Sequence, residues 1–427
     1  MLLLAIAFII FLTLLGMPLF AGILAIAMVG FHFADVDLMV IAIDLYRITQ
    51  TPLIEAIPLF TFAGYLLSAS NSSQRLVRVT QALLGWMPGG LAIVALIACA
   101  LFTAFTGASG VTIVALGALL YPALQQAGYQ QRFSLGLVTT SGSLGLLFPP
   151  SLPLILFGVI ALQMEMPVTM TIEQLLVAGI IPGLLMIAML SAYSIWAQGS
   201  ASATTQAFSL QELRAAIKEA KWEMPLPLIL LGGIYSGYFA LSEAAVVTVV
   251  YLLIVEVFLY KDIKLKALPN LVAEAMVMVG GILIILSCSL VLTSYFIEID
   301  APTSLFDWVT QHIQSQLSFL ILLNIFLLIL GAFLDIFSAI VIMVPLILPI
   351  AASFGIHPVH LGVIFLANMQ IGYMTPPVGM NLFISSYRFG KPITEIYRST
   401  VGFMLVLLSS LLIITYWPSL SLLFVDS

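Results

Sequence analysis

Two short polar stretches interrupt long hydrophobic segments of this chain, and a pair of prolines follows each stretch. Residues 141–145 read SGSLG before Pro149-Pro150, and residues 368–372 read NMQIG before Pro376-Pro377. Proline removes a backbone donor and clashes with the preceding helical turn, so each stretch leaves backbone carbonyl oxygens free. Free carbonyls beside Ser, Thr and Asn oxygens suit Na⁺, and the positive ends of half-helices suit an anionic ligand. The two breaks therefore predict binding of a cation and an anion, with simple helix kinks as the alternative.

Two other places in apolar sequence carry polar side chains that could join these breaks. Ser109 lies between Gly107 and Gly110, where small residues could also serve only close helix packing. Asp335 stands alone, because the nearest Lys or Arg residues in the sequence are Lys266 and Arg388. An ionised carboxylate at membrane depth is unfavourable and usually functional. We therefore expect a cation to bind Asp335, unless a loop exposes this side chain to water.

The composition places these residues in a membrane protein. The chain has 427 residues, of which 62% are hydrophobic and 7% are charged, whereas soluble domains have roughly a quarter charged residues. With 13 Lys and Arg against 19 Asp and Glu, no basic surface is available to bind nucleic acid. A spanning helix needs about 20 apolar residues, so the chain could hold roughly ten to twelve crossings and re-entrant segments.

A shift of 227 positions relates two halves of the chain. It carries Pro149-Pro150 onto Pro376-Pro377, and it also superimposes three further pairs, Pro122 with Pro349, Gly128 with Gly355 and Gly145 with Gly372. Broken helices in paired halves indicate the binding site of a secondary transporter.

The distribution of charge predicts that the halves have opposite orientations. Lys and Arg in short loops favour the cytoplasm. Arg75 and Arg78 precede the segment 90–125 and Arg132 follows it, so this segment should enter and return as a hairpin. The segment 318–353 should do the same from the outer side. We therefore predict an all-α polytopic membrane protein with two inverted-topology repeats, re-entrant hairpins and broken helices.

The predicted organisation has three parts. They are a first repeat (1–199, with the hairpin 90–125 and the broken helix 133–162), a cytoplasmic amphipathic connector (200–223) and a second repeat (224–427, with the hairpin 318–353 and the broken helix 360–387). The connector should begin at a Ser cap with Glu212 in its first turn. Residues 1–33 should match 228–260 as paired short helices, although Gly16-Met17-Pro18 could instead kink one long helix.

A different class of protein is also conceivable. The motif Gly107-Ala108-Ser109-Gly110 matches the GxSG sequence around the serine of rhomboid-type intramembrane proteases. Such an enzyme needs a His base at membrane depth. The four His residues fall at predicted segment ends, so this alternative is remote and we expect no enzymatic activity.

The most specific stretches resemble the large membrane subunit of a TRAP (tripartite ATP-independent periplasmic) transporter. They read GASGVTIVALGALLYPALQQAGY (107–129), SGSLGLLFPPSLPLILFG (141–158), LGGIYSGYFALSEAAVV (231–247) and MTPPVGMNLF (374–383). The resemblance covers nearly the whole chain. It implies an elevator-type carrier in the bacterial inner membrane that couples uptake of a small organic anion to Na⁺, with no other cofactor. Its implied partners are a small four-helix membrane subunit and a periplasmic binding protein.

The resemblance also implies particular site residues. A first Na⁺ site would lie between the inner hairpin tip and the first break, at Gly107, Ser109, Ser141, Ser143 and Gly145. A second Na⁺ site would lie between the outer tip and the second break, at Asp335, Ser338, Gly372 and Thr375. The candidates for substrate contact are Ser109, Ser143, Asn368, Thr375 and Asn381.

The mechanism expected from these features is movement of one block against another. The hairpins and broken helices would form a mobile block that slides against a frame including 53–69, 174–197, 270–297 and 399–423. Two alternatives of related fold remain, a stand-alone sodium–carboxylate symporter and a proton antiporter in which Asp335 titrates. Dependence on a binding protein separates the first of these, and proton counterflow separates the second.

Overall fold

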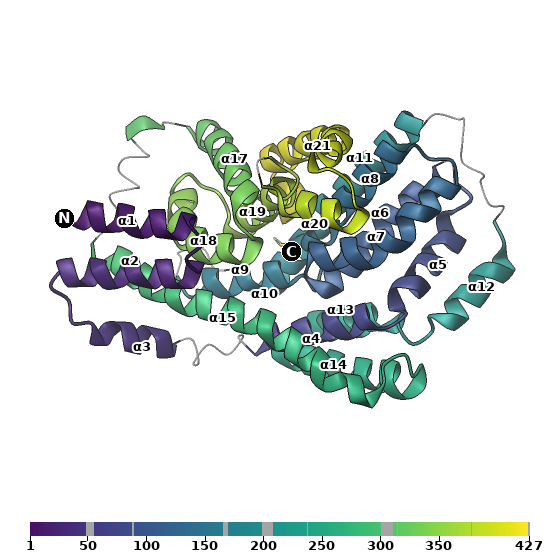
Figure 1. Ribbon diagram of the computed structural model, residues 1–427, viewed down its shortest axis with the longest axis horizontal. Helices are drawn as coiled ribbons and strands as arrows, with labels where there is room; N and C mark the ends of the chain where they lie inside the picture. The colour runs from purple at the N-terminus through teal and green to yellow at the C-terminus, as the bar shows by residue number, and fades with distance from the viewer. Residues whose placement is uncertain are drawn as a thin grey trace.

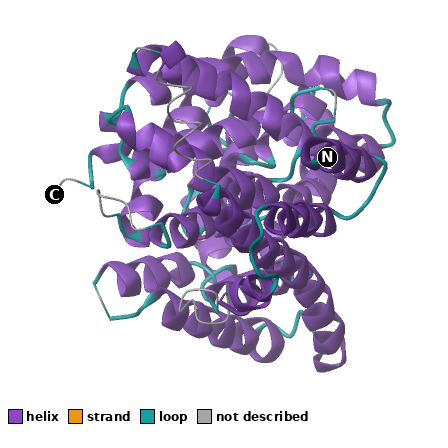
Figure 2. Ribbon diagram, turned by 90° about the vertical axis from the view of Figure 1, so that its left-hand side faces the viewer, coloured by secondary structure: helices purple, strands orange, loops and turns teal. Residues whose placement is uncertain are grey.

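The computed structural model is all-helical. It describes residues 1–47, 55–87, 89–164, 170–198, 208–236, 238–299, 311–313, 315–376 and 378–425, and no strand occurs among them (Figure 2). Within these residues, seven helices are long and apolar enough to span a membrane, and five further apolar helices have 10–17 residues. Pro376 lies in the described part of the chain, whereas Pro377 lies outside it.

The first half contains eleven described α-helices. They are α1 (Leu2–Leu14), α2 (Leu19–Phe33), α3 (Met39–Arg47), α4 (Ala56–Ala69), α5 (Ser72–Leu84), α6 (Gly90–Thr106), α7 (Ser109–Gln126), α8 (Gln131–Ser141), α9 (Leu152–Leu162), α10 (Ile172–Ala178) and α11 (Ile180–Gln198). A 3₁₀ turn, η2 (Leu144–Leu147), lies between α8 and α9. The N-terminal segment therefore forms two short helices, because Gly16 takes a positive φ of 109° between them.

The second half begins after the helix α12 (Leu210–Glu219). Its helices are α13 (Pro225–Tyr235), α14 (Leu241–Leu252), α15 (Leu268–Glu298), α17 (Gln316–Phe333), α18 (Ile336–Ser353), α19 (Pro358–Gly372), α20 (Met380–Phe389), α21 (Ile393–Tyr416) and α22 (Ser419–Leu422). A π-helical turn, η4 (Leu253–Leu259), continues α14, and the short 3₁₀ turn η5 (Leu265–Ala267) precedes α15. Glu243 accepts a hydrogen bond from the Ala240 N–H at 2.9 Å, so this carboxylate caps α14.

The helix bounds repeat at the shift of 227 positions. The shift carries α7 onto 336–353, which are the bounds of α18, and carries α6 to within one residue of α17. The glycines that follow these second arms, Gly128 and Gly355, both have positive φ, at 87° and 74°. Each hairpin also packs on the other half, since α7 contacts α20 and α18 contacts α9. The predicted hairpins and broken helices are thus confirmed, and the contacts between the halves are reciprocal.

The helices form a frame and a block that packs on it. In Figure 1, α15 runs along the lower side of the molecule, with α2 and α3 packed at one end of it and α4 at the other, and α14 packs on α4. The hairpins α6–α7 and α17–α18 and the broken helices lie above this frame. Contacts between frame and block are made by α4 on α6 and α9 and by α15 on α18.

The predicted frame needs one correction. The segments 174–197 and 399–423 were expected to belong to it, but α11 packs on α6 and α21, and α21 packs on α8 and α19. Both segments therefore cover the broken helices and belong to the block. The physical reason is that α8 and α19 are buried on all sides, so they need apolar partners beyond the two hairpins.

Residues 208–223 are the described part of the predicted connector, and their helix α12 packs against α5. The helix α12 starts at Ser209, whose hydroxyl accepts a hydrogen bond from the Glu212 N–H, as predicted. Residues 200–207 lie outside the described residues. Arg78 on α5 pairs with Glu212 at 2.9 Å and also with Glu219. These contacts join the connector to the helix that leads into the first hairpin.

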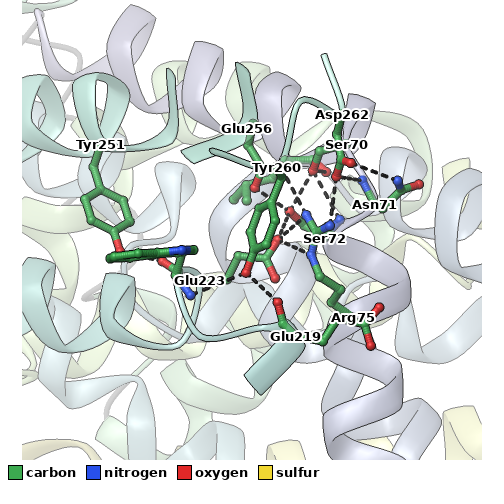
Figure 3. A network of polar contacts seen from close by, with 12 residues as sticks. Ser70, Asn71, Ser72, Arg75, Glu219, Glu223, Tyr251, Glu256, Tyr260 and Asp262 are labelled. Carbon is green, nitrogen blue, oxygen red and sulfur yellow. Dashed lines mark hydrogen bonds and ion pairs between the residues drawn. The ribbon is translucent and has the colours of Figure 1, made fainter. Parts of the chain in front are cut away.

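A buried cluster of charged side chains around Arg75 also joins α5 to the second half of the chain (Figure 3). The guanidinium is 2.7 Å from Glu223, 2.8 Å from Asp262 and 3.1 Å from Glu256. Burial alone lowers the pKa of Arg75. The hydrogen bond and charge of Glu223, the hydrogen bond to Asp262 and the charge of Glu256 together raise this pKa above its ordinary value. Arg75 therefore stays charged and joins α5 to η4 and to the residues before α13.

Candidate functional site

The first break joins both arms of the first hairpin. The helix α8 ends at Ser141, and the chain passes through η2 and a cis Pro149-Pro150 bond before α9 begins. The Thr103 hydroxyl on α6 donates to the Gly142 carbonyl at 2.9 Å and lies 2.6 Å from the Thr112 hydroxyl on α7. Both threonines are fully buried. Because α6 and α7 contact one carbonyl through this pair, the hairpin and the break form one packed unit.

Two glycines allow the breaks to approach the hairpins closely. A Cβ atom at Gly145 would lie 2.2 Å from the Ala100 carbonyl oxygen on α6, and one at Gly372 would lie 2.6 Å from the Gly331 Cα on α17. Backbone atoms cannot rotate away as a side chain can, so only glycine fits at these positions. These glycines were predicted as members of the Na⁺ sites. The structure gives them a close-packing role at equivalent positions of the two halves.

The second break is hydrogen-bonded to the second hairpin. The Gly379 N–H donates to the Ala332 carbonyl at 3.0 Å, and the Ile336 N–H donates to the Tyr373 hydroxyl oxygen at 2.6 Å. Tyr373 is buried, and its aromatic ring gave no signal in the sequence. Two hydrogen bonds therefore join the tip around residues 334–335 to the break, one between backbone groups and one to the Tyr373 hydroxyl.

Asp335 caps the helix α18. Its Oδ1 accepts hydrogen bonds of 3.0 Å from the N–H groups of Phe337 and Ser338, and its Oδ2 accepts one from the Ser338 hydroxyl. The structure thus brings Asp335 and Ser338 together, as the second Na⁺ site predicted. Thr375 lies just after α19 and instead donates to the Ile371 carbonyl near the end of that helix, at 3.0 Å. Asp335 is half-buried and has local partners, so its presence in apolar sequence has a structural explanation besides cation binding.

The two breaks meet near the axis that relates the halves. The Ser143 hydroxyl lies 3.4 Å from the Gln370 carbonyl oxygen, and these two positions are 227 residues apart. Positions that correspond in two related halves can touch only near the symmetry axis. Thr139 on α8 and Ser385 on α20 also join the halves, through a hydroxyl–hydroxyl hydrogen bond of 2.9 Å.

Polar atoms without partners gather around these breaks. Atoms that are buried and have no hydrogen-bond partner within the described protein include Thr106 Oγ1, Thr140 Oγ1, Ser151 Oγ, Asn368 Oδ1 and both amide atoms of Gln370 and of Asn381. Leaving such an atom unpaired costs about 1–3 kcal/mol, so buried polar atoms are normally satisfied. Their concentration at the hairpin tip and the breaks indicates a site that binds a polar ligand.

The helix ends surround the same region. The helices α7, α9, α18 and α20 all begin at a hairpin tip or a break, whereas α6, α8, α17 and α19 end there. Close contacts join these ends, since a Cβ atom at Gly107 would lie 2.8 Å from Leu152 at the start of α9. Helix N-termini favour anions and C-termini favour cations. The arrangement can therefore bind both charges with backbone dipoles.

The predicted substrate residues have different surroundings. Asn381 is buried, Ser109 is 4% exposed at the first residue of α7, and Ser143 contacts the second break. Asn368 donates to Asn324 Oδ1 at 2.7 Å and leaves its own Oδ1 unpaired. Sequence reasoning missed Gln370, although it lies inside the break that was recognised.

Four other polar residues were missed in the same region. These are Thr103, Thr112, Thr140 and Ser151, and nothing in the sequence separates them from ordinary helix threonines and serines. The buried histidine, His360, contacts Ser421 at 3.1 Å and the Thr415 carbonyl at 3.3 Å. His360 lies in the first turn of α19, so it is at a segment end as predicted and is also buried, and neither contact involves Ser109.

Paired broken helices and hairpins with a central polar site define a multi-pass membrane protein of the secondary-transporter class. The fold is similar to the YdaH transporter of Alcanivorax borkumensis, with a TM-score of 0.58, 15% identity and coverage of 87% of this chain and 88% of that one. The sequence matches the family described as "Tripartite ATP-independent periplasmic transporter, DctM component" over residues 2–420. The chain belongs to this family.

Curated relatives agree with this assignment over nearly their whole length. The C4-dicarboxylate TRAP transporter large permease protein DctM of Pseudomonas aeruginosa is 35% identical over 90% of this chain and 88% of that protein. The protein of the same name from Rhodobacter capsulatus is 33% identical over 96% of both chains. The ectoine/5-hydroxyectoine large permease protein UehC of Ruegeria pomeroyi is 32% identical over 96% of this chain and 95% of that protein. All three relatives are permeases.

Proposed function

We propose that this chain moves a small organic anion across the bacterial inner membrane in symport with Na⁺. The observation that carries the proposal is the group of unpaired buried polar atoms at the two breaks, above all the amides of Gln370 and Asn381. Four helix N-termini supply positive potential for the anion at the same place. An anion that carries its own acceptor oxygens would satisfy the amide N–H groups without a basic side chain.

The cation sites belong between each tip and its break. The first would use oxygens near Gly107, Ser109, Ser141, Ser143 and Gly145, where the C-terminal ends of α6 and α8 lie. The second would use Asp335 and Ser338 with carbonyls near Gly372 and Thr375. Hard oxygen ligands of this kind suit Na⁺ better than a transition metal. Asp335 keeps its capping bonds in this proposal, because a carboxylate has about four lone-pair sites and three are in use.

The block would move against the frame as an elevator. The moving part would contain both hairpins, both broken helices and the covering helices α10, α11 and α21, whereas α2–α4 and α13–α15 would stay fixed. The helix α5 links the frame to the first hairpin, and the Arg75 cluster would hold its first turn in place. A membrane potential of 100 mV contributes about 2.3 kcal/mol per net positive charge moved inward, so two Na⁺ with a monoanion would drive accumulation.

The partners follow from the family. We propose a small membrane subunit as a separate chain and a periplasmic binding protein that delivers the substrate. One relative bears the name isethionate TRAP transporter permease protein DctMQ, and another bears the name sialic acid TRAP transporter permease protein SiaT. The names of the relatives mention C4-dicarboxylate, isethionate, ectoine and sialic acid, so the binding protein is expected to select the particular compound.

The test is uptake into liposomes that contain this chain and its small partner. Candidate acids, isethionate and ectoine would be offered with and without the binding protein and an inward Na⁺ gradient. Uptake that needs both would support the proposal. Uptake without the binding protein would favour a stand-alone symporter, and uptake driven by a proton gradient alone would overturn the assigned coupling ion.

A further inference from the structure

A polar cavity lies between the frame and the block, separate from the breaks. Its volume is about 320 Å³, and it is lined from α3 and α15 on one side and from α9, the turn after it and α18 on the other. None of its lining residues belongs to a hairpin tip or a break. Figure 1 shows α3, α9 and α18 near the same half of α15.

Asp44 is the only carboxylate among the described residues that line this cavity. Asp44 on α3 is only 7% exposed, and its Oδ2 is buried without a hydrogen-bond partner in the described protein. None of the described residues that line the cavity is Lys, Arg or His, and no ion pair found in the described part of the chain includes Asp44. A buried ionised carboxylate without a partner is strongly unfavourable. A cation that enters the cavity would remove this penalty.

The other lining residues fit a cation that carries an apolar body. Gln163, Thr293 and Ser294 add neutral oxygens, whereas the walls at Ile160 and Leu290 are aliphatic. An ammonium group donates three hydrogen bonds and has no acceptor, which matches one carboxylate and neighbouring neutral oxygens. The volume lies in the range of small-molecule sites, and a predominantly apolar lining with a few polar groups is typical of them. A bare alkali ion would use little of this space.

We propose that this cavity binds a small organic ammonium ion. The ammonium group contacts Asp44 and the hydroxyl groups of Thr293 and Ser294, and the alkyl part packs on the aliphatic wall. This site has the opposite charge preference from the central site, because the Asp44 carboxylate repels anions. It contacts both the frame and the block, so under the proposed elevator movement its occupancy is expected to slow uptake.

The binding test does not depend on transport. The purified chain with its small subunit would be placed in phosphatidylcholine nanodiscs, and binding of n-propylammonium chloride would be measured by equilibrium dialysis and by the shift in Tm. Controls at equal ionic strength are sodium chloride and 1-propanol. The expected result is saturable binding of propylammonium alone, weakened at least tenfold by Asp44→Asn and several-fold by Thr293→Val.

Matched variants separate this proposal from its alternatives. Asp37→Asn changes an exposed carboxylate close to α3 and is expected to leave binding unchanged. Arg47 lies one turn beyond Asp44, and its side chain is outside the described residues. Binding that appears only in Arg47→Gln would mean that the chain's own arginine neutralises Asp44, and it would overturn the proposal.

The source of the ammonium group can be distinguished in the same assay. Phosphatidylethanolamine in the nanodisc would compete with propylammonium if a lipid headgroup occupies the site, and it would have no effect if a free amine does. An equal response to sodium chloride, or unchanged binding in Asp44→Asn, would refute an ammonium site.

Discussion

Gln370→Met should make the ligand-free protein more stable and inactive at the same time. The Gln370 side chain is fully buried, and neither its Oε1 nor its Nε2 has a hydrogen-bond partner in the described protein. Methionine has nearly the same length and is unbranched, so it can occupy the same space without polar atoms. Replacement of a buried unpaired amide by an apolar group of similar shape should therefore stabilise the ligand-free state by about 1–3 kcal/mol.

The same change should impair binding. A hydrogen bond to a charged group contributes about 1.5–3 kcal/mol, and each 1.4 kcal/mol is about tenfold in affinity. Loss of one such bond to the anion predicts a roughly tenfold to hundredfold weaker apparent affinity in uptake. Thermal unfolding in nanodiscs without substrate measures the first effect, and Na⁺-driven uptake over a range of substrate concentrations measures the second.

A neighbouring residue provides the control for this prediction. Met369 is also fully buried in α19, and Met369→Leu conserves an apolar core position, so both stability and uptake should change little. If Gln370→Met lowered the stability of the ligand-free protein and left uptake intact, the amide would have a structural partner. The assignment of the breaks as the binding site would then be wrong.

Three further predictions test other parts of the structure. Gly145→Ala would place its Cβ 2.2 Å from a backbone oxygen and should destabilise the protein by about 1–3 kcal/mol in thermal unfolding. Its control, Gly280→Ala, has no atom within 4 Å of the added Cβ and should leave stability unchanged or raise it in the same assay. Asp335→Ala should lower the stability of the protein by about 1 kcal/mol, because the cap of α18 is lost. Asp335→Asn should keep the cap and still raise the Na⁺ concentration needed for half-maximal uptake. An unchanged Na⁺ dependence in both variants would remove Asp335 from the cation site. Arg75→Gln leaves Glu223 and Glu256 buried without their cation and should destabilise the protein by about 3–5 kcal/mol. Its control, Arg78→Gln on the exposed face of the same helix, should change the melting temperature little. Equal effects of the two variants on stability would contradict the buried cluster.

The Asp335 prediction differs from what the sequence alone suggested. In apolar sequence a lone carboxylate indicates function, so the sequence alone predicts that Asp335→Ala abolishes uptake and leaves folding intact. The structure places the same carboxylate at the first turn of α18, where it accepts two backbone hydrogen bonds. Only a charge-removing variant that still caps the helix can separate the two roles.

The sequence by itself determined the membrane class, the repeat, the hairpins and the breaks. Pro and Gly act locally, through a missing N–H, a fixed φ or a positive φ, so their positions predict where a helix must end. The shift of 227 residues then gives the second half from the first, and the bounds of α7 and α18 follow it. The connector cap at Ser209 is local in the same way.

Only the tertiary structure decided which side chains share a site. Thr103, Thr112 and Thr140 look like ordinary helix residues in the sequence, because the atoms that surround their hydroxyl groups come from other helices. The assignment of α11 and α21 to the block depends on contacts between distant segments in the same way. Burial without a partner at Gln370 and Asp44 is a property of packing in three dimensions. No local pattern in the chain encodes it.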